Sequence, residues 1–415
     1  MLSELRLSTF KSGKSTANWS AFPPVQGLEA GAGNKAIVGW YRNWYKWNGV
    51  VPRMYLVAII IEPLQCSGPM KGVEGELMVT MRDVAREAGV SKATVSYVVS
   101  GSPLISEKTA AKVRTAMEKL GYSVNHTARA LSTARTNAIG VVTSFNEDGC
   151  FDLSAGTYLY GISAAARRHG YDTMLLTGAD GVETIRSVAL SRRVDGIVIL
   201  DVYNDDPRIE AVRESGIPAV LLGSPADPQG VDVVDSNFEQ AAVSLVGRLR
   251  DGGHRSILFI GWPESVYRRN LNYAVRFRAS LLEACEAMDV RVDAVYARDV
   301  TLGASEVIQR ALGDHPDATA MIIHNDAAVV GAPQAFERMG VRVPEDLSVA
   351  TIVPVQLGEG MQIPFDSVGI DVEAVSFHTV DRLVERIAEP GLPAVVELLE
   401  QPLNVKGSVR MLHGD

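Results

Sequence analysis

The chain has 415 residues, more than one hydrophobic core usually serves, so two or three folding units are expected. Hydrophobic residues make up 47% and charged residues 21%, which excludes a wholly disordered chain, a collagen and a coiled-coil rod. The net charge of −9 argues against a nucleic-acid partner only if it is spread evenly. Residues 1–78 carry net +3, residues 79–136 net +5 and residues 137–415 net −17. This uneven distribution of charge indicates a small basic unit that binds polyanions and a large acidic body that does not.

The three cysteines, Cys66, Cys150 and Cys285, are too few and too scattered for a disulfide framework or a zinc site, and no cofactor is expected. The longest strongly apolar run, residues 55–61, is far shorter than the roughly 20 residues of a membrane-spanning helix. Lys11 and Lys14 interrupt the segment in which a secretory signal would need its apolar region. We therefore expect a cytoplasmic protein without a membrane partner.

Residues 1–78 show no sustained helix period, although they contain four of the five tryptophans. Two interpretations are open for this extension. It is either a mostly disordered or non-native segment, or translation starts at Met78 or Met81, immediately before the first well-patterned helix.

Three short amphipathic helices are predicted from residue 80 onward. Thr80 and Asp83 have the spacing of a capping box, and Gly89 ends the first helix. Ser91 caps the second helix, residues 92–99, in which Val95, Val98 and Val99 face inward. The Gly-Val-Ser turn between the two helices predicts a helix-turn-helix.

A third helix is predicted to begin after Ser106, which caps it, and to end at Gly121. Its apolar face combines four residues at helical spacing, Ala110, Val113, Met117 and Leu120. Asn125 caps a further short helix, residues 126–133, which has too few apolar residues to fold alone.

From residue 138 onward, short apolar runs alternate with amphipathic stretches. The predicted strands are residues 139–143, 172–176, 196–200, 219–222, 256–260 and 320–323. The predicted helices are residues 159–170, 184–192, 237–251, 274–288 and 304–312. Buried strands that alternate with helices at this spacing predict parallel sheets in an α/β fold, and the length fits two lobes.

Two sets of motifs carry a resemblance to a known family. The run Val79–Ser96, with Gly101-Ser102-Pro103, Ser106, Gly121-Tyr122 and Asn125–Leu131, closely resembles the DNA-binding headpiece of the lactose-repressor (LacI) family of bacterial transcription regulators. Residues 137–415 resemble the effector core of that family, which is similar to periplasmic sugar-binding proteins, through Gly253-His254-Arg255, Asn325-Asp326 and Val343–Val349. The resemblance implies a helix-turn-helix domain at 79–124, a hinge at 125–136 and a two-lobed effector-binding and dimerisation domain at 137–415.

The second helix is the expected recognition helix. If it enters the major groove by its N-terminal end, it offers Lys92, Ala93 and Tyr97 to base edges. Lys92 can donate to guanine, and Ala93 can touch a thymine methyl. Many family members carry Arg at the position of Tyr97, so the preferred operator half-site is expected to differ.

Four hydroxyl-bearing residues near the helix starts suit phosphate contacts, namely Thr80, Ser91, Thr94 and Ser96. A purely structural role as helix caps is the alternative for Thr80 and Ser91. The two roles are compatible.

The resemblance makes Asn125–Thr133 a hinge helix that becomes ordered when two copies meet over the operator centre. Leu131, with Ala128 beside it, is the predicted wedge in a minor-groove base step, and Arg129 lies near phosphates. An ordinary linker leucine is the alternative. Val124 replaces the proline that usually precedes this hinge, so its entry is less rigid.

The effector is expected between the lobes at the carboxyl ends of the strands, where Asp326 follows the strand at 320–324. Asp326 could instead be the N-cap of the next helix. Ser154 and Tyr273 are weaker candidates, and Tyr273 stands near the place of an arginine that clamps sugar oxygens or carboxylates in many relatives. The run Ala350–Pro354 replaces the usual Gly-aromatic-Asp-Asp. These departures indicate an unusual effector or a core that has lost inducer binding.

The sequence therefore predicts a homodimeric, effector-responsive transcription regulator, expected to be a repressor, which binds a pseudo-palindromic operator and associates with the nucleoid. A small-molecule carrier or receptor without gene control is the alternative. An enzyme ranks third, because the chain has no P-loop, no Gly-x-Ser-x-Gly, no His-Glu-x-x-His and no Gly-x-Gly-x-x-Gly after a strand. No catalytic or metal-ligating residue is assigned.

Overall fold

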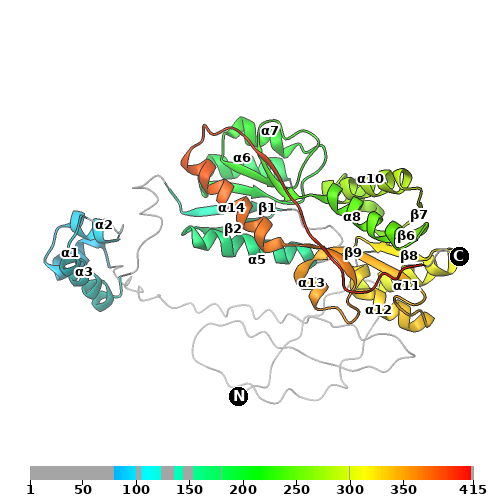
Figure 1. The fold of residues 1–415 in the computed structure, drawn as a ribbon. Coiled ribbons are helices and arrows are strands. Elements are labelled where there is room, and N and C mark those ends of the chain that lie inside the picture. Colours follow the sequence, from blue (N-terminus) through cyan, green and yellow to red (C-terminus); the bar gives the residue numbers. More distant parts are fainter. Residues whose placement is uncertain are drawn as a thin grey trace, which may run out of the picture. The chain divides into compact units, whose positions relative to one another are not determined.

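The chain is represented by a computed structural model, which describes residues 79–99, 104–122, 135–143, 153–178, 180–298 and 300–412. These residues form a small helical headpiece and a larger α/β core (Figure 1). Among the described helices, none is long and apolar enough to cross a membrane.

Three helices build the headpiece: α1 (Met81–Ala88), α2 (Lys92–Val99) and α3 (Glu107–Leu120). Each helix contributes one fully buried valine to a shared core, Val84 from α1, Val95 from α2 and Val113 from α3. Val98 and Val99 are only half-buried, so the predicted inward face of α2 is carried mainly by Val95.

Local hydrogen bonds explain where these helices begin and end. The Asp83 carboxylate accepts from the Thr80 backbone N–H at 3.0 Å and from the Thr80 hydroxyl at 2.6 Å. These bonds hold the pKa of Asp83 below its ordinary value. The Thr94 N–H donates to Ser91 Oγ at 3.0 Å, as an N-cap requires. Gly89 ends α1 with a left-handed φ of 67°, a conformation that glycine adopts without steric cost.

The first lobe of the core contains a parallel six-stranded sheet in the order β11-β5-β4-β3-β1-β2. Its strands are β1 (Ala138–Val142), β2 (Asp172–Leu176), β3 (Gly196–Ile199), β4 (Ala219–Leu222), β5 (Asp232–Ser236) and β11 (Val396–Leu399). Its helices are α5 (Leu153–Arg168), α6 (Gly181–Ser191), α7 (Arg208–Ser215) and α14 (Val372–Ala388).

The second lobe contains another six-stranded sheet in the order β12-β10-β9-β8-β6-β7, parallel except for the pair of β10 and β12. Its strands are β6 (Ser256–Gly261), β7 (Arg291–Tyr296), β8 (Ala320–Ile323), β9 (Ser348–Pro354), β10 (Asp366–Ile370) and β12 (Leu403–Asn404). Its helices are α8 (Phe238–Asp251), α9 (Glu264–Arg268), α10 (Asn272–Ala287), α11 (Thr301–Asp314), α12 (Asp326–Met339) and α13 (Val355–Glu359).

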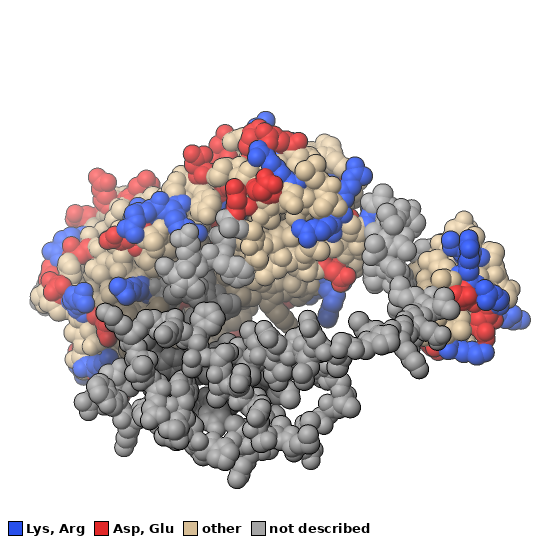
Figure 2. Space-filling model, turned by 180° about the vertical axis from the view of Figure 1, so that it is seen from behind, with Lys and Arg blue, Asp and Glu red and all other residues tan. Residues whose placement is uncertain are grey.

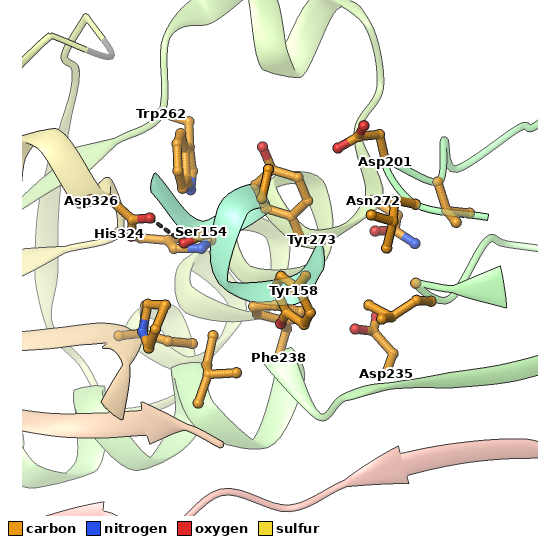
Figure 3. A pocket seen from close by; sticks show the side chains of 18 of the residues that line it. Ser154, Tyr158, Asp201, Asp235, Phe238, Trp262, Asn272, Tyr273, His324 and Asp326 are labelled. Carbon is orange, nitrogen blue, oxygen red and sulfur yellow. Dashed lines mark hydrogen bonds between the residues drawn. The ribbon is translucent and has the colours of Figure 1, made fainter. Parts of the chain in front are cut away.

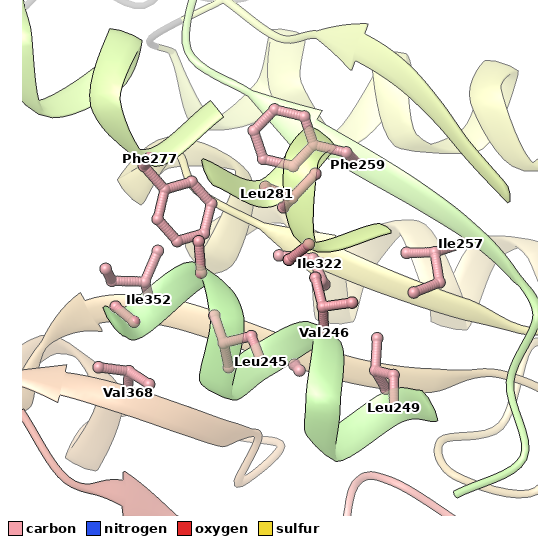
Figure 4. Close-up of a cluster of buried hydrophobic side chains, with 14 of the residues drawn as sticks. Leu245, Val246, Leu249, Ile257, Phe259, Phe277, Leu281, Ile322, Ile352 and Val368 are labelled. Carbon is pink, nitrogen blue, oxygen red and sulfur yellow. The ribbon is translucent and has the colours of Figure 1, made fainter. Parts of the chain in front are cut away.

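Apolar helix faces cover the sheets on both sides. In the second lobe, Leu245 and Leu249 of α8 and Phe277 of α10 pack over Ile257 and Ile322 of the sheet (Figure 4). All five side chains are fully buried. At about 25 cal/mol per Å² of buried apolar surface, such clusters are the main source of stability of each lobe.

The chain passes between the lobes three times, after β5, after β10 and after β11. Each lobe is therefore built from discontinuous segments. The short connections at residues 237, 371 and 400–402 are the places where the two lobes can turn relative to each other.

The predicted α/β class with parallel sheets in two lobes is confirmed, and the predicted bounds of β2, β4 and β8 are those of the structure. The first core helix, α5, begins at Leu153 rather than at residue 159. Strand β5 was not predicted because its sequence, Asp-Val-Val-Asp-Ser, is interrupted by acids. Both aspartates are buried and ion-paired, and the pairing compensates the cost of burying their charges in a strand.

Candidate functional site

A pocket lies between the two lobes of the core. Its volume is about 750 Å³, which includes space open to solvent. The strands of both lobes aim their carboxyl ends at it: Asp201 follows β3, Asp235 lies in β5, Trp262 follows β6 and His324 follows β8. This is the place where open α/β sheets bind ligands.

The three sequence-predicted effector residues, Ser154, Tyr273 and Asp326, all line this pocket. Ser154, in the first turn of α5, donates a hydrogen bond from its hydroxyl to the Asp326 carboxylate (Figure 3). The two residues belong to different lobes, so the bond spans the pocket. That these residues contact an effector stays a prediction.

The alternative that Asp326 caps the following helix is wrong. Asn325 is the N-cap of α12, and its side-chain oxygen accepts from the Ala328 N–H at 2.9 Å. Asp326 is the first helical residue, where a carboxylate is favoured by the helix dipole. It is buried and faces the pocket.

Aromatic rings form one side of the pocket. Tyr273 packs edge-on against Trp262, with the ring centroids 5.4 Å apart. His324 lies between these rings and Phe238, at centroid distances of 5.8 Å from Trp262, 6.2 Å from Tyr273 and 6.0 Å from Phe238. Burial lowers the pKa of His324 to about 3, so its imidazole is neutral at physiological pH.

Two aspartates and an asparagine, Asp201, Asp235 and Asn272, lie together at another side of the pocket (Figure 3). The Thr143 hydroxyl donates to the Asp201 carboxylate at 2.6 Å. Asp235 accepts from the Ser224 N–H at 3.0 Å. The Ser236 N–H donates to Asp235 Oδ1 at 2.8 Å, so local hydrogen bonds fix the orientation of this carboxylate.

Arg276 of α10 clamps Asp235 from the opposite lobe. Its Nη1 lies 2.5 Å from Asp235 Oδ2, and its Nε and Nη2 lie 2.7 Å and 2.6 Å from the two carboxylate oxygens of Glu239. Burial is the largest influence on Asp235 and raises its pKa to about 6, while Arg276 acts in the opposite direction. The clamp sits beside Asn237, where the chain passes between the lobes.

Three buried polar atoms of the pocket have no hydrogen-bond partner among the described residues: Trp262 Nε1, Asn272 Nδ2 and His324 Nδ1. The side chains are between 1% and 4% exposed. Buried polar atoms are normally paired, so orphans that converge on one cavity indicate groups that a ligand satisfies.

The end of β9 adds an apolar surface. Ile352, Val353 and Pro354 line the pocket and are buried. They belong to the run Ala350–Pro354, which replaces the Gly-aromatic-Asp-Asp that is usual in the LacI family, so no carboxylate enters the pocket from this strand.

The described headpiece residues present a polar outer face on α2. Lys92, Ala93, Ser96 and Tyr97 are exposed, and Thr94 is half-buried. Thr80 and Ser91 are exposed as well as acting as caps. The remaining predicted DNA-binding residues, Asn125, Ala128, Arg129 and Leu131, lie outside the described residues.

Charge on the headpiece is mixed but basic overall. Figure 2 shows Lys and Arg side chains at several places on the face in view, with acidic side chains among them. Arg86, Arg114 and Lys119 are paired with Asp83, Glu107 and Glu87. Arg82, Lys92, Lys108 and Lys112 take part in no ion pair with a described residue, so their charges are available to phosphates.

Sequence reasoning missed several pocket residues, namely Tyr158, Asp201, Asp235, Phe238, Trp262, Asn272 and His324. A signal was present for some of them. Asp201, Trp262 and His324 come directly or almost directly after predicted buried strands, as Asp326 does. Asp235 and Asn272 gave no such signal because β5 was not predicted and Asn272 opens a helix.

Comparison with known proteins identifies both parts of the chain. Residues 80–125 match the family model of bacterial regulatory proteins of the lacI family, and residues 246–409 match the periplasmic binding protein-like domain. The transcriptional regulator CelR of Thermobifida fusca is 31% identical over 336 residues, 79% of this chain and 98% of that protein. Catabolite control protein A of Priestia megaterium is 29% identical over 306 residues, 69% of this chain and 89% of that protein.

Solved structures agree with these relationships. A CelR–cellobiose complex is similar with a TM-score of 0.58 and 27% identity, covering 80% of this chain and 99% of that chain. The lac repressor dimer bound to operator is similar with a TM-score of 0.68 and 25% identity over the same shares. These relatives are transcription regulators, not enzymes. The chain thus belongs to the LacI family of transcriptional regulators.

Proposed function

We propose that this regulator binds a pseudo-palindromic operator as a homodimer, with α2 as the recognition helix. The outer face of α2 carries the proposal, because Lys92, Ala93, Ser96 and Tyr97 are exposed there while Val95 holds the opposite face in the core. A helix with this arrangement can offer side chains to base edges while its caps direct backbone N–H groups at phosphates.

The domain assignment belongs to the same proposal: a DNA-binding domain at 79–124, a hinge at 125–136 and an effector-binding and dimerisation domain at 137–415. The lac repressor structure named above is a dimer on operator DNA, which supports the dimer for this chain. Leu131 is the proposed minor-groove wedge, with Ala128, Arg129 and Asn125 in the same hinge.

A small molecule in the inter-lobe pocket is proposed to control DNA binding. Residues of both lobes line the pocket, so a ligand there changes the relative stability of two lobe arrangements. The sign of regulation is proposed to be repression, in a cytoplasmic, nucleoid-associated protein. We propose no catalytic activity, since its relatives are transcription regulators.

Selection from a randomised duplex library, followed by a gel-shift titration with the selected duplex, tests the proposal. Affinity is expected to fall by at least about a hundredfold between 50 and 200 mM salt, because several phosphate contacts release counterions. Retention of no DNA, or an affinity that does not change with salt, would contradict it. That result would favour the alternative of a small-molecule receptor without gene control, which the pocket by itself also supports.

A further inference from the structure

One face of helix α10, in the second lobe, is bonded to the first lobe. The Asn272 N–H, at the start of α10, donates to the Val202 carbonyl at 3.0 Å. One turn later, Arg276 reaches the Asp235 carboxylate at 2.5 Å. Residues four apart lie on the same face of a helix, so both bonds come from the same side of α10.

The segment before α10 continues this contact. The Asn204 N–H of the first lobe donates to the Asn270 carbonyl of the second lobe at 2.8 Å. Between these bonds, Tyr203 and Leu271 form an isolated antiparallel bridge. The backbones of the two lobes are therefore paired over residues 202–204 and 270–272.

Gly223 allows this close approach of the two lobes. It follows β4 in the first lobe and has a φ of 135°, which favours glycine. A Cβ atom at this position would lie only 2.9 Å from Asn272 Nδ2 and from the Val202 side chain. We call residues 270–276, together with their first-lobe partners at 202–204, 223 and 235, the α10 latch.

The ion pair of the α10 latch ties the burial of a charge to the contact between the lobes. The side chain of Asp235 is 4% exposed and that of Arg276 is 11% exposed. Arg276 is the one cation that pairs with Asp235 among the described residues, and it comes from the other lobe. Asp235 lines the pocket, so it gains access to water when the lobes separate. A buried carboxylate without its cation is strongly unfavourable, so the lobes can stay together with an ionised Asp235 only because Arg276 is present.

We propose that the α10 latch keeps the two lobes together without help from a ligand, with Arg276 as the counter-ion that the second lobe supplies to the first. A ligand of the pocket then shifts an arrangement that the protein already favours by itself. The inference goes beyond the proposed function, because it concerns the lobes and needs neither DNA nor an identified effector.

Hydrogen exchange of the full chain, resolved to single amides by mass spectrometry at pH 8, tests the proposal. The Asn204 and Asn272 amides report separation of the lobes, since each N–H donates to a carbonyl of the other lobe. The Val220 amide, in the buried strand β4, reports unfolding of the first lobe. Without DNA or ligand, the two inter-lobe amides are expected to exchange at least about a hundredfold more slowly than in an unstructured peptide.

Replacement of Arg276 by Met is expected to speed the exchange of both inter-lobe amides by at least about tenfold, because Asp235 is left buried without its cation. In Arg276→Met/Asp235→Asn no unpaired carboxylate remains, and exchange is expected to return to within about threefold of the wild type. Arg276→Lys keeps the charge but offers one ammonium to both carboxylates. An intermediate rate is expected for it, and this variant provides the test if the methionine variant does not fold.

Two control variants separate opening of the lobes from general loss of stability. Arg386→Met weakens a pair within the first lobe, because Arg386 bonds to Asp232 of the same lobe at 2.8 Å. It is expected to speed exchange at Val220 and to leave the inter-lobe amides within about twofold of the wild type. Arg278→Met, on the same helix as Arg276, is expected to leave the inter-lobe amides unchanged as well, since Arg278 stacks on Tyr267 within its own lobe.

Three results would each overturn the proposal. Inter-lobe amides that exchange in the wild type as fast as in an unstructured peptide would mean that the lobes separate freely without a ligand. Unchanged exchange of these amides in Arg276→Met would mean that the ion pair does not hold the lobes together. If Arg276→Met/Asp235→Asn exchanged as fast as Arg276→Met, the role of Arg276 as a counter-ion would be wrong.

Discussion

Ser154 and Asp326 are 172 residues apart in the chain, lie in different lobes and share a hydrogen bond across the pocket. The bond joins the first turn of α5 to the first turn of α12. Backbone hydrogen bonds also join the lobes, from the Asn272 N–H to the Val202 carbonyl at 3.0 Å and from the Asn204 N–H to the Asn270 carbonyl at 2.8 Å. The lobes are therefore held together on more than one side of the pocket.

Ser154→Ala is expected to lower the free energy of unfolding by about 1–2 kcal/mol, because the buried Asp326 carboxylate loses a donor. With Asp326→Ala, which removes the acceptor, in a double-mutant cycle, the coupling energy is expected to be about 0.5–1 kcal/mol. Urea unfolding followed by circular dichroism measures all four proteins. Ser215→Ala is the control, because Ser215 bonds only to Val212 within its own helix among the described residues. Additive effects of Ser154→Ala and Asp326→Ala would show that the inter-lobe bond is not formed in solution.

Loss of the ion pair between Arg276 and Asp235 is expected to destabilise the fold more than loss of the Ser154–Asp326 hydrogen bond. Arg276→Met leaves the buried Asp235 without its cation, at a cost of about 3–5 kcal/mol at pH 8. Loss of the guanidinium removes an influence that lowers the pKa of Asp235, so that pKa rises further above its value of about 6. At pH 5 the variant then holds a protonated, neutral Asp235, and the deficit is expected to shrink.

The measurement is the difference in unfolding free energy between the wild type and Arg276→Met at pH 8 and pH 5. Arg278→Met serves as a matched change on the same helix, since Arg278 stacks on the Tyr267 ring at 4.1 Å and does not bond to Asp235. A deficit that is the same at both pH values would rule out an ionised, unpaired Asp235 as its cause.

Different parts of the molecule were predictable from sequence to different degrees. The fully buried strands β4 and β8 could be predicted from their sequences. A short, unbroken apolar run between amphipathic helices is typical of a parallel strand that is covered on both faces. Strand β5 could not, because its Asp232 is paired with Arg382 at 3.0 Å and with Arg386 at 2.8 Å, both on a helix about 150 residues later. Long-range ion pairs of this kind leave no periodic pattern.

The pocket residues could be predicted only in part, because many of their contacts also join residues that are far apart in the sequence. Asp326, Ser154 and Tyr273 could be named through motif position, but the clamp of Arg276 on Asp235 depends on how closely the lobes approach each other. Spacing along the chain carries no information about that approach. The aromatic side has the same origin, since Trp262, Tyr273 and His324 come from three separate elements.

His324 is expected to make the core less stable in mild acid. Its pKa is about 3 in the folded chain and near 6.5 when unfolded, so only the unfolded state binds the proton between these values. The stability that the fold gains from the neutral imidazole of His324 is present in full above pH 6.5 and is lost as the pH falls. Between pH 6.5 and 5.0 the loss from this residue is about 1.5–2 kcal/mol.

Comparison of the wild type with His324→Gln at pH 6.5 and 5.0 isolates this contribution, because other titrating groups are shared by both proteins. The variant is expected to be less stable at pH 6.5, since it disturbs a packed aromatic cluster, and to lose less stability on acidification. An equal loss in both proteins would mean that His324 is already protonated in the fold, or that it is exposed to solvent.

Tyr97 is expected to determine part of the operator sequence. Its side chain is 48% exposed on the outer face of α2, so substitution there leaves the headpiece core around Val95 intact. Tyr97→Arg introduces a guanidinium group with five donors, which can bond to both acceptors of a guanine edge. Such a contact is worth about 1–3 kcal/mol of base discrimination.

Selections from one randomised operator library with the wild type, Tyr97→Arg and Tyr97→Phe measure the effect. The arginine variant is expected to shift specific half-site positions toward guanine, and the phenylalanine variant, which keeps the ring, is expected to stay near the wild-type profile. If the arginine variant selects the wild-type sequence, Tyr97 does not contact base edges, and the recognition surface of α2 must be assigned to Lys92 and Ala93 alone.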